Sequence, residues 1–192
     1  PRLLSGYLAR LSRESGIPVK NFKFHWHPTD SQRFFGVAGN GVWQINISTG
    51  EYIQIEKASV IGFGVGRTDV YFLTKNGALA RITQDNEPVT IRSLSPEDMK
   101  NITSTKGVAR IIAMNSQNFI SIDEAGKLIF LEDGQPPKIL AENSVGAISY
   151  SDGTRLAWVE PSTGSDSKLY VFFTQDIFDD FDNIFSQIRI AA

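Results

Sequence analysis

One segment pattern occurs five times along this chain. Each copy opens with Gly or a small polar residue, continues as an alternating apolar run, and starts at residue 6, 41, 77, 126 or 167. The successive spacings are 35, 36, 49 and 41 residues. Such near-regular self-similarity predicts a row of similar supersecondary units, each of which buries its apolar face against a neighbour.

Short runs rich in Val, Ile, Phe and Tyr fill these units and predict β-strands. The turns between them, such as Asn76-Gly77 and Asp152-Gly153, contain residues that tolerate the positive φ of tight hairpins. The chain therefore predicts an antiparallel meander. The predicted strands cover residues 22–26, 33–38, 42–47, 52–55, 70–74, 78–82, 89–93, 111–114, 119–122, 128–131, 147–150, 156–159 and 169–173.

The repeat and the meander together predict an all-β fold, a β-propeller fragment of about four four-stranded antiparallel blades, because such blades recur every 40 to 45 residues or so. The blades are expected at residues 20–58, 59–100, 101–143 and 144–192, the last with a C-terminal segment, in one continuous domain. Residues 1–19 are predicted to be the outer hairpin of a preceding blade, and the long third interval predicts an inserted loop around residues 95–105. A chain that starts mid-blade is expected to be a fragment of a longer protein.

Two parts of the sequence carry a resemblance to a known family. Residues 24–30 read Phe-His-Trp-His-Pro-Thr-Asp, and Phe34-Phe35-Gly36-Val37 and residues 41–51 follow, while residues 148–158 combine a strand, an Asp-Gly turn and a second strand. This pattern resembles bacterial β-propellers with WD-like and TolB-like repeats over most of residues 20–175. The resemblance implies the propeller fold and favours the cell envelope. More narrowly, it implies envelope proteins that carry a PEGA domain ahead of the propeller.

Composition excludes several classes of function. The chain has 19 basic and 21 acidic residues scattered along it, so we expect no nucleic-acid partner. It has no cysteine, so a disulfide framework, a thiolate nucleophile and a Cys-ligated zinc site are ruled out. No apolar run approaches the ~20 residues that span a bilayer, so we expect no membrane span in this chain.

Two clusters contain residue types that bind metal ions. His25 and His27 lie two apart on a predicted strand and could both face a metal ion, but a third ligand is missing and structural roles explain them better. An acidic cluster near the C-terminus suggests calcium, but its spacing differs from an EF-hand loop. Interleaved apolar residues there predict a loop or short amphipathic helix. The cluster consists of Asp176, Asp179, Asp180 and Asp182.

Three further motifs have structural explanations. Residues 62–66, Gly-Phe-Gly-Val-Gly, are followed by a predicted strand, whereas a phosphate-binding loop needs a helix there. Ser151-Asp152-Gly153 differs in spacing from the Asp-box of sialidases and predicts a hairpin turn. Asn46 and Asn101 open glycosylation sequons, which matter only in a eukaryotic secretory pathway.

We therefore predict no catalytic, cofactor-binding or metal-binding residue and no cofactor. The favoured function is a non-enzymatic protein-interaction or scaffolding module, since propeller loops and channels bind partners. Its partner would be another protein, or a second copy joined through the terminal blades. Two alternatives stay open: a propeller that accompanies a hydrolase or peptidase domain absent from this chain, and a carbohydrate-binding propeller.

Overall fold

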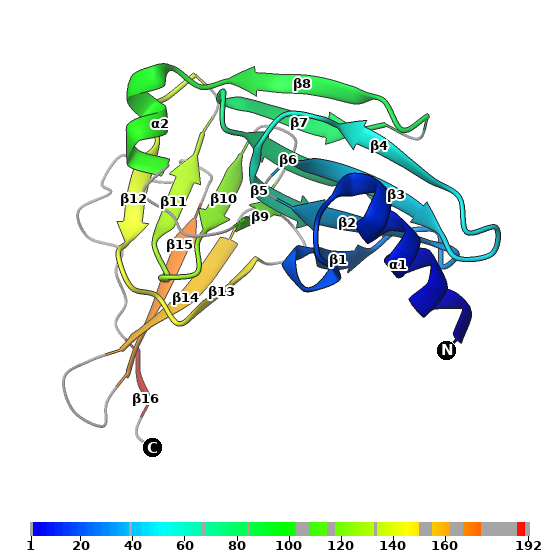
Figure 1. Ribbon diagram of the computed structural model, residues 1–192. Helices are drawn as coiled ribbons and strands as arrows, with labels where there is room; N and C mark the ends of the chain where they lie inside the picture. Colours follow the sequence, from blue (N-terminus) through cyan, green and yellow to red (C-terminus); the bar gives the residue numbers. More distant parts are fainter. Residues whose placement is uncertain are drawn as a thin grey trace. The chain divides into compact units, whose positions relative to one another are not determined.

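Antiparallel strands that pair in sequence order make up most of this fold (Figure 1). The computed structural model describes residues 2–38, 40–66, 68–83, 85–102, 108–114, 118–132, 134–149, 155–161, 167–173 and 188–190. These residues form two units, Pro1–Thr103 and Ser104–Ala192. Each unit is described by itself.

The first unit contains two meanders of four strands. In the first meander the antiparallel order is β1-β2-β3-β4, and in the second it is β5-β6-β7-β8. The strands are β1 (Lys23–Trp26), β2 (Arg33–Ala38), β3 (Gly41–Asn46), β4 (Tyr52–Glu56), β5 (Val60–Val65), β6 (Val70–Thr74), β7 (Ala78–Ile82) and β8 (Pro88–Ser93).

The second unit repeats this arrangement. Strands β9 to β12 pair antiparallel in sequence order, and strands β13 to β16 do the same. Their bounds are β9 (Ala109–Ala113), β10 (Phe119–Ile122), β11 (Leu128–Leu131), β12 (Lys138–Ala141), β13 (Gly146–Ser149), β14 (Arg155–Pro161), β15 (Ser167–Phe173) and β16 (Ile188–Ile190). The predicted all-β fold of four-stranded antiparallel propeller blades is thus confirmed.

A glycine at the turn before the third strand recurs and explains why the repeat pattern opens with Gly. Gly77 and Gly126 have φ of +87° and +86°, a region that glycine enters without strain. The carbonyl of Gly77 accepts a hydrogen bond from Leu94 N at 2.8 Å, and that of Gly126 accepts one from Ser144 N at 2.7 Å. Each bond joins the turn to the residue that follows the fourth strand or lies a few positions beyond it. We call this contact the glycine latch.

The two sheets of the first unit pack face to face. Phe35 on β2 lies against Phe63 on β5, with ring centroids 5.8 Å apart. Gln44 donates a hydrogen bond from Nε2 to Asn86 Oδ1 at 2.6 Å. Phe63 and the neighbouring glycines therefore belong to strand β5 and to the core, a strand that the sequence prediction had omitted.

Residues 1–19 are the main correction to the sequence prediction. Arg2–Ser15 form helix α1, and Val19–Asn21 form the short 3-10 helix η1, so the predicted outer hairpin is wrong. Leu4, Leu8 and Leu11 recur at helical spacing, and Leu11 is fully buried in a cluster with residues of β2 and β3. The helix thus covers the sheet face that points away from β5–β8.

Contacts near the end of α1 hold it on the sheet. The Tyr52 hydroxyl on β4 donates a hydrogen bond to the Glu14 carboxylate. Arg10 lies over the Tyr52 ring at 5.4 Å and pairs with Glu14 at 2.9 Å. Gly50 contacts the Tyr7 ring so closely that a Cβ there would overlap it.

The predicted loop around residues 95–105 is partly helical. Pro96–Ile102 form helix α2, which buries Met99 and Ile102. Ser95 precedes the helix, where its hydroxyl accepts a hydrogen bond from Asp98 N at 3.1 Å, and its own N–H donates to Asp98 Oδ2 at 3.2 Å. This reciprocal cap, followed by Pro at the first helical position, starts the helix.

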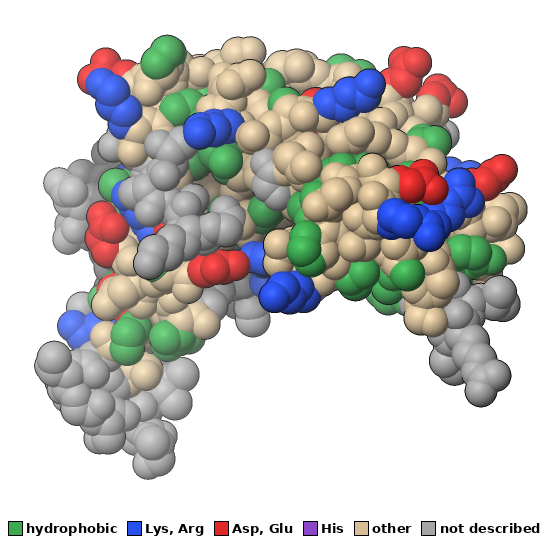
Figure 2. All heavy atoms as spheres, in the orientation of Figure 1, with side chains coloured by type: hydrophobic (Ala, Val, Ile, Leu, Met, Phe, Trp, Pro, Cys, Tyr) green, Lys and Arg blue, Asp and Glu red, His purple; other side chains and the backbone are tan. Residues whose placement is uncertain are grey.

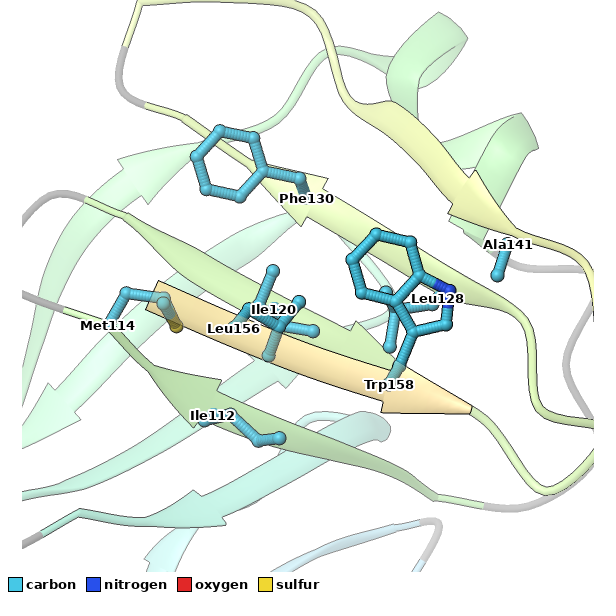
Figure 3. Packing of buried hydrophobic residues seen from close by; sticks show 8 residues of the cluster. All are labelled: Ile112, Met114, Ile120, Leu128, Phe130, Ala141, Leu156 and Trp158. Carbon is cyan, nitrogen blue, oxygen red and sulfur yellow. The ribbon is translucent and has the colours of Figure 1, made fainter. Parts of the chain in front are cut away.

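The core of the second unit lies between its two sheets (Figure 3). From β14, Leu156 and Trp158 reach the face formed by β9, β10, β11 and β12. The Trp158 ring stacks on Tyr170 with centroids 5.3 Å apart, and its Nε1 donates to Glu160 Oε1 at 3.0 Å. The buried cluster comprises Ile112, Met114, Ile120, Leu128, Phe130, Ala141, Leu156 and Trp158.

Neither α1 nor α2, nor any other helix in the described ranges, has the length and apolar character needed to cross a membrane.

Candidate functional site

A row of aromatic side chains crosses the face of sheet β1–β4 that α1 covers. Phe22 meets Trp43 edge to face at 5.3 Å and stacks on Phe24 at 5.8 Å. The rings of Phe24 and Trp26 both meet the Phe34 ring edge to face, with centroid distances of 5.6 Å and 6.0 Å. Such offset and T-shaped pairs are the favoured geometries for aromatic rings, so the row is a rigid platform.

Glycine at position 36 allows the rings to lie across the sheet. Gly36 on β2 pairs with Phe24 on β1, and a Cβ at Gly36 would lie 3.2 Å from the Phe24 ring and 3.3 Å from the Phe22 ring. The missing side chain leaves the space that the two rings occupy. The sequence Phe34-Phe35-Gly36 therefore shapes the platform as well as the strand.

Helix α1 covers only part of this row. Phe22 and Phe34 are buried, whereas Phe24 is 39% exposed and Trp26 is 62% exposed. Beside them lies an open hollow of ≈ 160 Å³. We call it the aromatic hollow; its lining residues are Leu8, Phe24, His25, Trp26 and Phe34.

Strand β1, which supplies three of these residues, is the edge strand of its sheet. An edge strand with large exposed apolar side chains is a feature that proteins usually avoid, because it invites association. Here the edge strand β1 also lines the hollow. Among the described residues, the lining is therefore mostly apolar, with the His25 imidazole as its polar group.

The N-terminal residues that form α1, η1 and β1 are rich in basic side chains. Residues 1–33 contain six basic and two acidic side chains, a formal charge of +4 in a chain whose total is −2. Arg10, Arg13, Lys20 and Lys23 are exposed. Figure 2 shows Lys and Arg side chains gathered over the region of α1, next to hydrophobic ones.

The two histidines have separate structural surroundings. The His25 ring packs on Phe63 at 4.9 Å, and the His27 ring stacks on Phe35 at 5.5 Å. His27 Nδ1 accepts hydrogen bonds from Asp30 N at 3.1 Å and Thr29 N at 3.3 Å, so it closes the turn between β1 and β2. Across the described ranges, no three His, Asp, Glu or Cys side chains are grouped closely enough to hold a metal ion.

The turn made by His27 predicts a small pH dependence of stability. Burial lowers the pKa of His27 from 6.5, although Asp30 opposes this and Arg33 adds to it. The fold favours the neutral ring, so its contribution is present above about pH 6.5 and is lost as the pH falls further. We expect His27→Asn to reduce the loss of urea resistance between about pH 7 and about pH 5. An unchanged pH profile would contradict this role.

The remaining sequence candidates lie elsewhere or outside the described residues. Asn46 caps a turn, where its Oδ1 accepts hydrogen bonds from Ser48 N at 2.9 Å and Thr49 N at 3.2 Å. Asn101 belongs to helix α2. The acidic cluster at 176–182 and the turn at 151–153 fall outside the described residues.

Sequence reasoning did not find the aromatic hollow. The alternation of Phe22, Phe24 and Trp26 along a strand predicts ordinary core packing, and Phe22 does pack against Trp43 and α1. Exposure of the other two depends on where α1 stops covering the sheet. A signal was present in the helical spacing of Leu4, Leu8 and Leu11, which predicts a helix when it is weighed against the strand pattern.

The exposure of Trp26 predicts a fluorescence result. Trp43 and Trp158 are 4% and 2% exposed, against 62% for Trp26. Iodide in the solvent should therefore quench mainly Trp26, and Trp26→Phe should remove most of the quenchable fluorescence. Trp43→Phe is the matched control and should leave the quenchable fraction nearly unchanged. Equal quenching of the two variants would contradict the described geometry.

Comparison with known proteins finds similar folds at low sequence identity. The solved structures similar to this chain include TolB from Acinetobacter baumannii, with 15% identity, a TM-score of 0.46, and coverage of 80% of this chain and 41% of that one. Oligogalacturonate lyase from Vibrio parahaemolyticus has 15% identity and a TM-score of 0.48, with 78% and 49% covered. The WD40 domain of Toxoplasma gondii coronin has 12% identity and a TM-score of 0.46, with 77% and 41% covered.

The chain spans less than half the length of each of these three structures. No family model matches it, and no curated protein matches it. The resemblance to TolB-like and WD-like repeats, noted in the sequence, thus has counterparts among solved structures. The link to PEGA-domain proteins stays a prediction.

Proposed function

We propose that this chain is a non-enzymatic interaction module of the β-propeller type, and that it binds a protein partner or a second copy of itself. The observation that carries the proposal is the aromatic hollow. Phe24 and Trp26 are exposed at the edge of a sheet in which Phe34, Phe35 and Trp43 are buried. Large aromatic residues are enriched where proteins bind each other, since they bury much apolar area at little cost in side-chain entropy.

The proposal includes the organisation of the chain. Four consecutive blades, at residues 20–58, 59–100, 101–143 and 144–192, would belong to one propeller domain of a longer protein. In support, each of these ranges contains four strands that pair in sequence order. The sheet-to-sheet cores around Phe35 and Trp158 are also of the kind that joins neighbouring blades.

Of the two alternatives, an exposed Trp side chain favours carbohydrate binding, because aromatic faces stack on sugar rings. A carbohydrate-active site also needs carboxylates that converge on the ligand. Among the residues that the structure describes, the lining of the aromatic hollow consists of Leu, Phe, His and Trp side chains and includes no carboxylate. Protein binding accounts better for this lining.

Site-specific crosslinking tests the proposal. A photoreactive benzoylphenylalanine replaces Phe24 in the full-length protein, expressed in its source cells. In a matched control it replaces Ile53, which is similarly exposed on β4 of the same sheet. We expect protein adducts at position 24, either with another protein or with a second copy.

Two results would count against an interaction module. One is the absence of any adduct at position 24 while the protein is folded and expressed. The other is a shift of Trp26 emission by a neutral oligosaccharide, with no protein adduct at all. That pattern would favour the carbohydrate alternative.

A further inference from the structure

We propose that the aromatic hollow of one copy binds residues 174–187 of a second copy, so that the chains associate head to tail. This inference rests on the proposed interaction function and names the partner. The hollow supplies the receiving surface, and the sequence of residues 174–187 supplies the ligand chemistry.

The chemistry of the segment is unusual within this chain. Residues 174–187 read Thr-Gln-Asp-Ile-Phe-Asp-Asp-Phe-Asp-Asn-Ile-Phe-Ser-Gln, with four carboxylates and no basic side chain. The formal charge of this segment is −4, and it contains five Ile or Phe residues. It therefore combines large apolar side chains with concentrated negative charge.

The N-terminal part of the chain, which supplies Leu8, Phe24 and Trp26 to the hollow, has the opposite charge. Residues 1–33 have a formal charge of +4, equal and opposite to that of the segment. Arg10 and Arg33 already pair with Glu14 and Asp30. The exposed Arg13 and Lys20 extend the positive surface on α1 and η1. Complementary charge accelerates association and selects the partner, while buried aromatic contact supplies most of the affinity.

The apolar parts also match. The hollow is walled by Leu8, Phe24 and Phe34, and Trp26 stands exposed at its rim. Its ≈ 160 Å³ are open to solvent, so an entering Phe or Ile side chain displaces water from apolar walls. Trp26 would then be buried by the partner, which converts it into a reporter of binding.

The contact is heterologous, because the hollow and the segment are different surfaces of the chain. If each of two copies binds the segment of the other, a closed dimer forms. Otherwise each copy binds the next one, and a longer chain of copies forms. Either way the solution mass rises above that of one chain, which is 21.3 kDa. We expect this mass to fall with added salt, since charges contribute to the contact.

The first experiment measures the mass of the full chain by light scattering after size exclusion, with calcium chelated. We expect a mass of at least about twice 21.3 kDa for the unaltered chain. Trp26→Ala should weaken association about tenfold or more, as should the double variant Asp179→Lys with Asp180→Lys. Two control variants should leave the mass unchanged. The first is Val145→Ala, since the Val145 side chain is 69% exposed. The second combines Asp85→Lys with Glu142→Lys, which changes the net charge by the same amount at two exposed residues.

Mixing the two weakened variants separates a lost contact from a damaged fold. The Trp26→Ala chain retains an intact segment, and the double Asp variant retains an intact hollow. Their mixture should form a complex of both chains, whereas each alone stays at the mass of one chain. A synthetic peptide of residues 174–187 should shift the Trp26 emission to shorter wavelength and dissociate the unaltered complex.

The outcomes separate this inference from the proposed function. Any one of three results overturns the head-to-tail contact. The unaltered chain stays monomeric, the mixture of the two variants stays monomeric, or the peptide leaves the Trp26 emission unchanged. If position 24 still forms adducts with another protein, the interaction function stands and only the partner is wrong. If neither adducts nor association are found, both proposals fail.

Discussion

Replacement of Trp158 by Ala should destabilise the second unit by about 3–5 kcal/mol, the range typical of large aromatic residues in cores. Trp158 is 2% exposed and lies between the sheets β9–β12 and β13–β16. Its loss removes the contact with Leu128 and Ala141, leaves a cavity, and ends the stacking on Tyr170. Hydrogen exchange followed by mass spectrometry on peptides from β10 and β11 measures the effect within that unit.

A milder variant tests the mechanism. Trp158→Phe retains much of the buried ring but loses the hydrogen bond from Nε1 to Glu160. We expect it to cost about 1–2 kcal/mol, mostly for the smaller volume. If both variants exchange like the unaltered chain, Trp158 does not belong to the core that holds these sheets together.

The second large effect is expected from Gly126→Ala. Gly126 has φ of +86°, which costs a residue with a Cβ about 1–2 kcal/mol. The new Cβ would also overlap the Ser144 carbonyl oxygen, and backbone there cannot move without breaking the glycine latch. We expect a total cost of more than about 2 kcal/mol, measured as a shift of the urea midpoint.

Gly134→Ala is the matched control for this prediction. Gly134 also has a positive φ, +71°, but a Cβ there meets nothing within 4 Å. Its cost should be limited to the backbone strain of about 1–2 kcal/mol. The difference between the two variants in the free energy of unfolding is the contribution of the glycine latch. An equal loss in both would show that only the positive φ matters.

Local sequence patterns were sufficient to predict most strands of this fold. The predicted strands at 33–38, 70–74 and 78–82 coincide with β2, β6 and β7. Their alternation and the Asn76-Gly77 turn are determined by neighbours in the sequence, which a pattern can capture. Strand β5 was omitted because its glycines hide the strand pattern, and burial of Phe63 between two sheets outweighs their low propensity.

The N-terminal residues show where such patterns fail. Residues 6–11, Gly-Tyr-Leu-Ala-Arg-Leu, nearly match residues 77–82, Gly-Ala-Leu-Ala-Arg-Ile, yet the first run is helical and the second is strand β7. The difference arises from context: residues 77–82 follow an Asn-Gly turn and pair with β6 and β8. The same context explains why the sequence pattern does not predict the candidate site. The aromatic hollow exists only where α1 leaves Phe24 and Trp26 uncovered.

The glycine latch also bears on how the repeat tolerates changes in length. Because the turn at Gly77 or Gly126 fixes the end of the fourth strand within the same sheet, the register of that strand does not depend on the connection that follows. Residues can then be added between one four-stranded meander and the next without shifting the register within either meander. Helix α2 is such an addition: it begins two residues after Leu94, where the latch of Gly77 closes. The interval of 49 residues between Gly77 and Gly126 thus reflects an insertion into the connection, while the meanders β5–β8 and β9–β12 keep the same antiparallel order.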